Sequence, residues 1–369
     1  APLQSFLTVA PFEVRHEVLV RLRDVAPDLG LTARARVEIG DLESLANRLR
    51  DLLVKRYSLR IDDEMPEPQL TRVDFLTLDE RGALPRPEPV AEEVETAWLG
   101  LTTVYTTPRT PRRLALTWND LGPANRLPAT VTDPETTRSA ELSAHQPTLV
   151  WTNELAADPA PVVAALAVDP PRLWLPTVSL LLLALLVGAA SSAIRSGRRR
   201  LLGPVVRVGV ALACLVAPVG AVAIPLPASL AVTPDRAAAT RVLSRILPSV
   251  YRAFEFPTES AVYDRLALVA TGDTLAEIYL EHRRAVELEE RGGARARVEA
   301  VEVIAVDEVR SGEGGGFVAD AVWTVGGTVT HFGHRHFRSN RYDARVSLVP
   351  VEGTWKIRAI EVFDEERLR

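Results

Sequence analysis

Two long apolar runs separated by an arginine cluster constrain this chain most. The first run, from Leu173 to Ile194, reads LWLPTVSLLLLALLVGAASSAI and carries no charge. The second run extends from Val208 to Pro234 and is also uncharged. A helix of about 20 apolar residues covers the ~30 Å hydrocarbon core of a bilayer. The sequence therefore predicts a transmembrane helical hairpin over residues 173–234, with the lipid bilayer as one partner.

The basic residues between the two runs predict an orientation. They are Arg195, Arg198, Arg199, Arg200 and Arg207, with no acidic residue among them. The positive-inside rule places such a loop in the cytoplasm, so both flanking segments should lie outside. We therefore expect a two-pass protein of the bacterial inner membrane with two periplasmic domains. Because the chain begins at Ala1 without a Met-initiated leader, we also expect a removed signal peptide.

Small residues recur at every fourth position of the second run, as Gly209, Ala213, Ala217 and Ala221. This spacing permits close approach of two helices. We expect that face to pack against the first run or against a partner helix.

The rest of the chain is long enough for two domains. Its formal net charge of −5 does not favour a polyanion partner, so nucleic acid is not expected. The single cysteine, Cys214, excludes an intrachain disulfide. Each domain must be stabilised by packing alone.

Residues 1–157 alternate short apolar stretches with turn residues, which is typical of a β-sandwich. One helix is expected over 42–55, where Asp41 can serve as the N-cap and leucines share one face. We find no nucleophile with a base, no metal cluster and no glycine-rich phosphate loop in this part of the sequence. The domain is predicted to be a binding or assembly module, joined to the first apolar run by a proline-rich tether over 158–172.

The spacing of the apolar residues changes within residues 235–369. The pattern is helical to about Glu290, and four alternating strands come after it, which indicates an α+β domain. The last strand begins Gly353-Thr354-Trp355-Lys356-Ile357. In this order of elements, residues 240–365 resemble the cone-shaped NTF2-like superfamily, which includes SnoaL-type and Tim44-type domains. The resemblance implies helices packed on a curved sheet around a concave pocket. Because the superfamily holds isomerases, hydratases and non-catalytic scaffolds, it assigns no catalytic residue.

The most unusual motif is His331-Phe332-Gly333-His334-Arg335-His336, which contains three of the six histidines. If Gly333 lies in a turn, alternate residues of the return strand share a face that continues into Ala344, Val346 and Leu348. His336 should then be less exposed than Arg335. With Asp320 from the preceding strand, the candidate ligand pocket comprises Asp320, His334, His336, Arg338, Asn340 and Tyr342.

Three uses of this motif are open. It can be a structural or partner contact, a small-ligand pocket, or a zinc or copper site formed by His331, His334 and His336. No separate cysteine or carboxylate ligand motif accompanies the histidines. We therefore expect no cofactor, and a bound zinc or copper ion is the alternative to that expectation.

The absence of a catalytic constellation favours a non-catalytic function. The sequence predicts a membrane-anchored periplasmic scaffold or accessory subunit that binds other envelope proteins through its two outer domains. One alternative is a SnoaL-like enzyme, or ligand-binding cone, in which a histidine or aspartate moves a proton on a small apolar substrate. The second alternative is a metal carrier or sensor.

Overall fold

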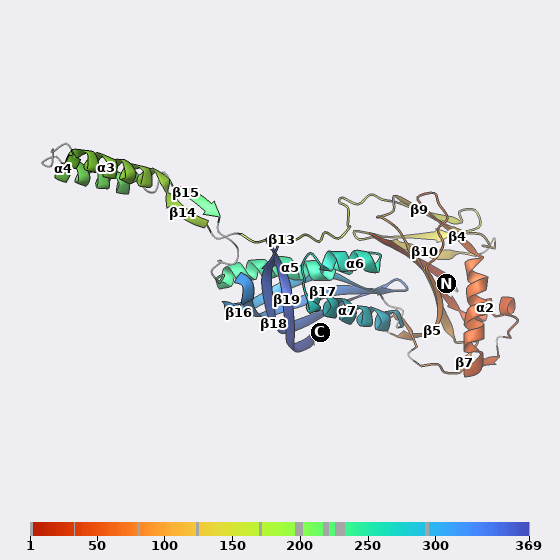
Figure 1. The fold of residues 1–369 in the computed structure, drawn as a ribbon. Coiled ribbons are helices and arrows are strands. Elements are labelled where there is room, and N and C mark those ends of the chain that lie inside the picture. Colours follow the sequence, from red (N-terminus) through yellow and green to blue (C-terminus); the bar gives the residue numbers. More distant parts are fainter. Residues whose placement is uncertain are drawn as a thin grey trace.

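The structure is a computed structural model, and it describes residues 3–32, 34–79, 82–86, 88–122, 125–169, 172–195, 202–216, 221–225, 233–291 and 295–368. Two folded domains lie side by side, and a helical hairpin projects away from both of them (Figure 1).

The first domain consists of two sheets packed face to face on one apolar core. The larger sheet has the order β11-β10-β1-β2-β8-β5-β6 and the smaller sheet has the order β12-β9-β4. The large sheet comprises β1 (Leu3–Ala10), β2 (Glu13–Arg21), β5 (Leu70–Asp79), β6 (Gly82–Pro85), β8 (Trp98–Thr106), β10 (Leu127–Thr132) and β11 (Thr137–Leu142), and the small sheet comprises β4 (Tyr57–Ile61), β9 (Arg113–Trp118) and β12 (Thr148–Thr152).

Short elements complete this domain. They are α1 (Leu22–Val25), the strand pair β3 (Arg36–Val37) and β7 (Glu92–Glu93), and helix α2 (Leu42–Val54). Leu45, Leu49 and Leu53 of α2 are buried, because leucines at this spacing share one helix face. Asp41 precedes α2, but its side chain makes no capping hydrogen bond.

The second domain packs helices on a five-stranded sheet of order β13-β19-β18-β17-β16. Its helices are α5 (Arg236–Ala253), α6 (Glu259–Leu266) and α7 (Asp273–Arg291); its strands are β13 (Leu166–Ala167), β16 (Arg295–Ser311), β17 (Phe317–His331), β18 (His334–Val351) and β19 (Thr354–Leu368). The segment predicted as a tether contains strand β13, in which Leu166 pairs with Trp355 of β19. The end of that segment is therefore part of the sheet.

The apolar runs do not form the two long helices that the sequence predicted. The first run divides between strand β14 (Arg172–Pro176) and helix α3 (Thr177–Arg195), and the second divides between helix α4 (Leu202–Val216) and strand β15 (Ala221–Pro225). Strands β14 and β15 pair antiparallel at the base of the hairpin. Strand pairing shortens both helices, and the 15 residues of α4 extend only about 22 Å at ~1.5 Å per residue.

Within the described residues, no helix combines the length and apolarity that crossing a membrane requires. The predicted transmembrane hairpin is therefore wrong, and with it the two-pass inner-membrane localisation and the periplasmic placement of both domains. Arg195 ends α3 and Arg207 lies inside α4, whereas Arg198, Arg199 and Arg200 lie outside the described residues.

The small-residue face of α4 packs against α3, as the spacing predicted. Ser179 Oγ donates a hydrogen bond of 2.6 Å to the carbonyl oxygen of Ala213. At Gly209, an added Cβ would lie 2.2 Å from Leu186 Cδ1, so the Leu186 side chain packs directly on the glycine backbone. Ala221 instead belongs to β15, and Ala217 lies outside the described residues.

Candidate functional site

The histidine motif forms the tip of the long β17–β18 hairpin. His331 pairs with His334, and the two residues between them, Phe332 and Gly333, have φ angles of +43° and +77°. Two consecutive positive φ angles are the signature of a type I′ hairpin turn. A bulky aromatic residue rarely adopts such a backbone, so contacts made by its side chain must hold it there. We call residues 331–336 the hairpin tip.

The side chain of Phe332 inserts into the outer face of the large sheet of the first domain. It is 1% exposed. Gly100 leaves room for the Phe332 ring, because a Cβ added at Gly100 would lie 2.1 Å from Phe332 Cζ. Gly333 similarly leaves room for Phe6, whose Cε1 would lie 2.4 Å from an added Cβ. The residues that surround Phe332, which we call the socket, are Phe6, Leu19, Leu76, Ala83, Trp98 and Gly100.

A buried carboxyl group lies beside the socket. Glu17 on β2 is fully buried, and its Oε2 accepts a 2.8 Å hydrogen bond from the backbone N–H of Phe332. Arg15 Nη1 lies 3.9 Å from Glu17 Oε1. Burial raises the pKa of Glu17 to about 7, although Arg15 and the Phe332 N–H act in the opposite direction. The first domain therefore holds the hairpin tip through a group that titrates near neutrality.

The three histidines of the tip lie close together. The ring centroid of His331 is 5.2 Å from that of His336, and His334 is 6.4 Å from each of them. His331 Nδ1 and His336 Nε2 are buried, and neither has a hydrogen-bond partner among the described residues. Burial lowers the pKa of His331, and His336, His334 and Arg338 lower it further. The His331 ring is therefore accommodated in its neutral form.

Side-chain alternation along β18 follows the prediction. His336 is half-buried and Arg335 is exposed, which confirms the expected order. On the same face, Ala344, Val346 and Leu348 are buried in the core of the second domain. The face thus continues from that core to the contact with the first domain.

No metal-binding arrangement of three or more His, Cys, Asp or Glu side chains occurs in the part of the chain that the structure describes. Zinc or copper binding by His331, His334 and His336 stays a prediction.

Two of the predicted pocket residues form a small network of their own. Asn340 Nδ2 donates to Glu365 Oε1 at 2.8 Å, and the Tyr342 hydroxyl donates to the same oxygen at 3.0 Å. The Tyr342 ring stacks on Trp323 at a centroid distance of 5.5 Å. Sequence reasoning missed Glu365 and Trp323, because only the strand register brings them opposite Tyr342. Arg338 is exposed.

The structure does not bring Asp320 to the histidines. Asp320 pairs with Arg345, with oxygen–nitrogen distances of 2.8 and 3.0 Å, and this contact lowers the pKa of Asp320. On β18, His336 and Arg345 are nine residues apart, which is about 30 Å at ~3.4 Å per residue. Side chains alternate between the two faces of a strand, so the even-numbered Asp320 and the odd-numbered His331 on β17 point to opposite sides of the sheet.

The layer between the helices and the sheet of the second domain is filled by side chains. This is the layer in which the resemblance to NTF2-like proteins implied a concave pocket. Its largest buried members include Phe317, Trp323, Leu348, Trp355 and Ile357 from the strands, and Leu243, Ile246, Leu247 and Leu266 from the helices.

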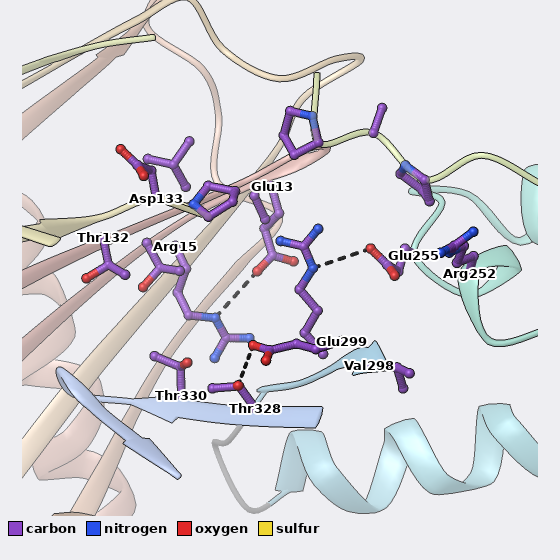
Figure 2. A pocket seen from close by; sticks show the side chains of 18 of the residues that line it. Glu13, Arg15, Thr132, Asp133, Arg252, Glu255, Val298, Glu299, Thr328 and Thr330 are labelled. Atoms are coloured by element: carbon purple, nitrogen blue, oxygen red, sulfur yellow. Dashed lines mark hydrogen bonds and ion pairs between the residues drawn. The ribbon is translucent and has the colours of Figure 1, made fainter. Parts of the chain in front are cut away.

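An open cleft of about 550 Å³ lies instead at the junction of the two domains. Figure 2 shows its walls. They come from the β1–β2 end and the β10–β11 turn of the first domain, the segment 158–162, the end of α5, and strands β16, β17 and β18. Three arginine–glutamate pairs line it: Arg15–Glu13 at 3.5 Å, Arg297–Glu255 at 3.4 Å and Arg335–Glu299 at 3.6 Å. Thr328 also hydrogen-bonds to Glu299. No sequence motif marks these residues, because they come from separate segments of the chain.

A serine–histidine pair lies inside the first domain and was also missed by sequence reasoning. Ser5 Oγ and His16 Nε2 are 2.9 Å apart, and both residues are buried between the sheets. The His16 ring meets the Tyr57 ring edge-on at 4.3 Å, and burial lowers the pKa of His16 to about 3. A substrate cannot reach this pair, so we assign it to core packing.

Comparison with known proteins adds little. No family model matches the chain, and no curated protein matches it. Among solved structures, the chain is similar to the crystal structure of the intermembrane space region of chloroplast protein ARC6, with 17% identity and a TM-score of 0.26. The match covers 35% of this chain and 96% of that structure, and similarity at this level supports no conclusion about the present protein.

Proposed function

We propose that this chain is a non-catalytic binding protein of the scaffold type, whose two coupled domains hold a segment of a partner protein in the cleft between them. One observation carries the proposal. The hairpin tip that carries the histidines is docked on the first domain through Phe332, while an open cleft lined by both domains lies next to that contact.

The cleft has the size and position of a binding site. Its volume of about 550 Å³ lies within the range of roughly 300–1,000 Å³ that is usual for ligand pockets, and such pockets are frequent at domain interfaces. Its walls combine charged pairs and threonine hydroxyls with the apolar surface of Val162 and Val298. A peptide segment suits these walls, because it offers amide groups, side chains of either charge and apolar side chains together.

The alternative of a SnoaL-like enzyme has less support. It needs an open pocket with an acid and a base converging on one point. The corresponding layer of the second domain contains a packed core, and Asp320 and His336 lie on opposite faces of the sheet.

Site-specific crosslinking tests the proposal. A photoreactive residue at Thr132, in the cleft, should capture a partner in cells of the source organism, whereas the same residue at the exposed Thr148 should not. With that partner purified, the double variant Arg252→Glu and Arg335→Glu should weaken binding at least about tenfold, equal to ~1.4 kcal/mol. Arg241→Glu, an exposed charge reversal outside the cleft on α5, is the matched control.

Two results would contradict the proposal. One is equal crosslinking from Thr132 and Thr148. The other is an affinity that the cleft variant and the control variant change by the same amount.

A further inference from the structure

We propose that one edge of β19 is a second docking site, at which an extended basic segment of a partner protein adds to the sheet of the second domain as a further strand. The site comprises residues 359–368, which we call the open edge. Among the described residues that line the cleft, none belongs to β19, and β19 and β16 lie toward opposite edges of the sheet. The inference therefore goes beyond the proposed function and can be tested independently of it.

The first half of the same edge is already covered by other segments of the chain. Strand β13 pairs with Trp355, and Ala270 forms a parallel bridge with Ile357. The Ile357 N–H also donates a 2.8 Å hydrogen bond to the carbonyl oxygen of Val269. β19 thus accepts extended segments from elsewhere in the sequence, and the surface that accepts them continues into the open edge.

The open edge has no strand beside it in the described part of the chain. On one side, β18 pairs with β19 as far as Leu368, whereas on the other side the pairing with β13 ends at Trp355. Every residue from Glu361 to Leu368 is exposed. A row of backbone N–H and C=O groups about 30 Å long, at ~3.3 Å per residue, is therefore available to another chain.

The apolar core of the second domain is incompletely covered at this margin. Val362 pairs with the buried Ala344, so its side chain lies on the face of the sheet that carries the core. The Val362 side chain is nevertheless 53% exposed, and the neighbouring Phe363 is 49% exposed. An added strand would bury this apolar surface, which would contribute to affinity together with the backbone hydrogen bonds.

The charges of the open edge favour a basic occupant. Four acidic residues and one arginine, Arg367, lie along it; the acids are Glu361, Asp364, Glu365 and Glu366. Lysine or arginine side chains opposite these acids stabilise strand pairing, whereas like charges in the same place destabilise it. A second copy of this chain is therefore a poor occupant, because antiparallel pairing of two open edges would bring two acidic sets together.

The cations of β18 leave this acidic charge largely available. Arg345 Nη1 lies 4.0 Å from Glu361, and Arg341 Nη1 lies 3.8 Å from Glu366. All four side chains are at least 36% exposed, and exposed pairs at such distances interact weakly. Glu365 accepts hydrogen bonds from two neutral groups of β18, which do not offset its charge.

A pair of synthetic peptides tests the open edge in the full chain. The first is an acetylated and amidated peptide of alternating lysine and valine, and its binding should protect backbone amides within residues 359–368 from hydrogen exchange. The second has the same sequence but is N-methylated at two consecutive central amides. It keeps every charge and lacks one backbone donor on each side of the strand. Its affinity, measured by fluorescence anisotropy, should be at least about tenfold lower.

Neutral variants of the chain test the preference for a basic partner. The triple variant Glu361→Gln, Asp364→Asn and Glu366→Gln removes three exposed carboxylates and keeps the shape of each side chain. Glu365 is retained because it bonds to β18. The affinity for the lysine–valine peptide should fall at least about tenfold, since each opposite-charge pair across two strands contributes to pairing.

The matched control is Glu43→Gln, Asp51→Asn and Glu67→Gln, which removes three exposed acids of the first domain and changes the net charge equally. It should alter the affinity by less than about twofold, because charges far from the peptide are screened by salt. Equal weakening by the two triple variants would overturn the proposal, as would equal affinity of the two peptides. Failure of the lysine–valine peptide to bind, or protection of amides only outside the open edge, would overturn it as well.

Discussion

The two hairpins of this chain differ in the burial of their apolar residues: those at the tip of the β17–β18 hairpin are buried, whereas many on the α3–α4 hairpin are exposed. The β17–β18 hairpin ends in Phe332, which is 1% exposed in the socket of the first domain. The α3–α4 hairpin leaves Leu181, Leu185 and Val208 at 63%, 66% and 64% exposure. Figure 1 shows why: the strand hairpin reaches the first domain, whereas the helical hairpin extends away from it. Burial of an apolar residue thus depends on a complementary surface within reach and not on local apolarity.

The largest effect should come from removing the aromatic ring at the tip. Phe332→Ala should cost about 3–5 kcal/mol of unfolding free energy, because it deletes a fully buried ring and leaves a cavity. Phe337→Ala, on the same hairpin at 67% exposure, is the matched control and should change stability by less than about 0.5 kcal/mol. Denaturant unfolding measures both, and similar costs for the two variants would mean that the socket contributes nothing.

A smaller effect should come from the charge beside the socket. As the pH rises from 4.5 to 7, Glu17 should destabilise the wild-type junction by at most roughly 3 kcal/mol, since its pKa is raised from 4.5 to about 7 and each unit corresponds to ~1.4 kcal/mol. Glu17→Gln should abolish that slope, because glutamine keeps an oxygen for the Phe332 N–H but does not titrate. Unfolding at a series of pH values checks this, and an unaltered slope in the variant would exclude Glu17 as its origin.

The smallest effect should come from the helical hairpin. Leu185→Ala should change the free energy of unfolding by less than about 0.5 kcal/mol, because the side chain is already exposed in the folded state. Thermal unfolding of the variant beside Phe332→Ala gives the contrast directly. A cost of several kcal/mol for Leu185→Ala would show that this hairpin is covered by another surface in solution.

Local features of the second domain could be predicted from the sequence. The alternation that separates His336 from Arg335, and the face shared with Val346 and Leu348, result from the period of two in a strand. Proline usually interrupts a helix, but α5 continues from Arg236 to Ala253 with Pro248 inside it. Burial of Ile246, Leu247 and Val250 outweighs the hydrogen bond that proline removes.

The candidate site could not be predicted in the same way. Phe332 and Glu17 are 315 positions apart, and their contact requires both the register of the hairpin and the packing of one domain on the other. The cleft likewise unites residues from distant segments. Asp320 was placed with the histidines because it lies on the neighbouring strand, but register and parity place it far along the opposite face.

By itself, the sequence determined the properties that depend on neighbours along the chain: the strand periodicity, the leucine face of α2, the tight turn at Gly333 and the small-residue face of α4. Only the tertiary structure decided how the apolar runs divide between helix and strand, since β14 finds its partner β15 across the hairpin. It also decided that the histidine tip contacts the first domain. The physical reason is common to both cases: pairing and burial between distant segments contribute more free energy than local preference, and a single sequence does not record which segments meet.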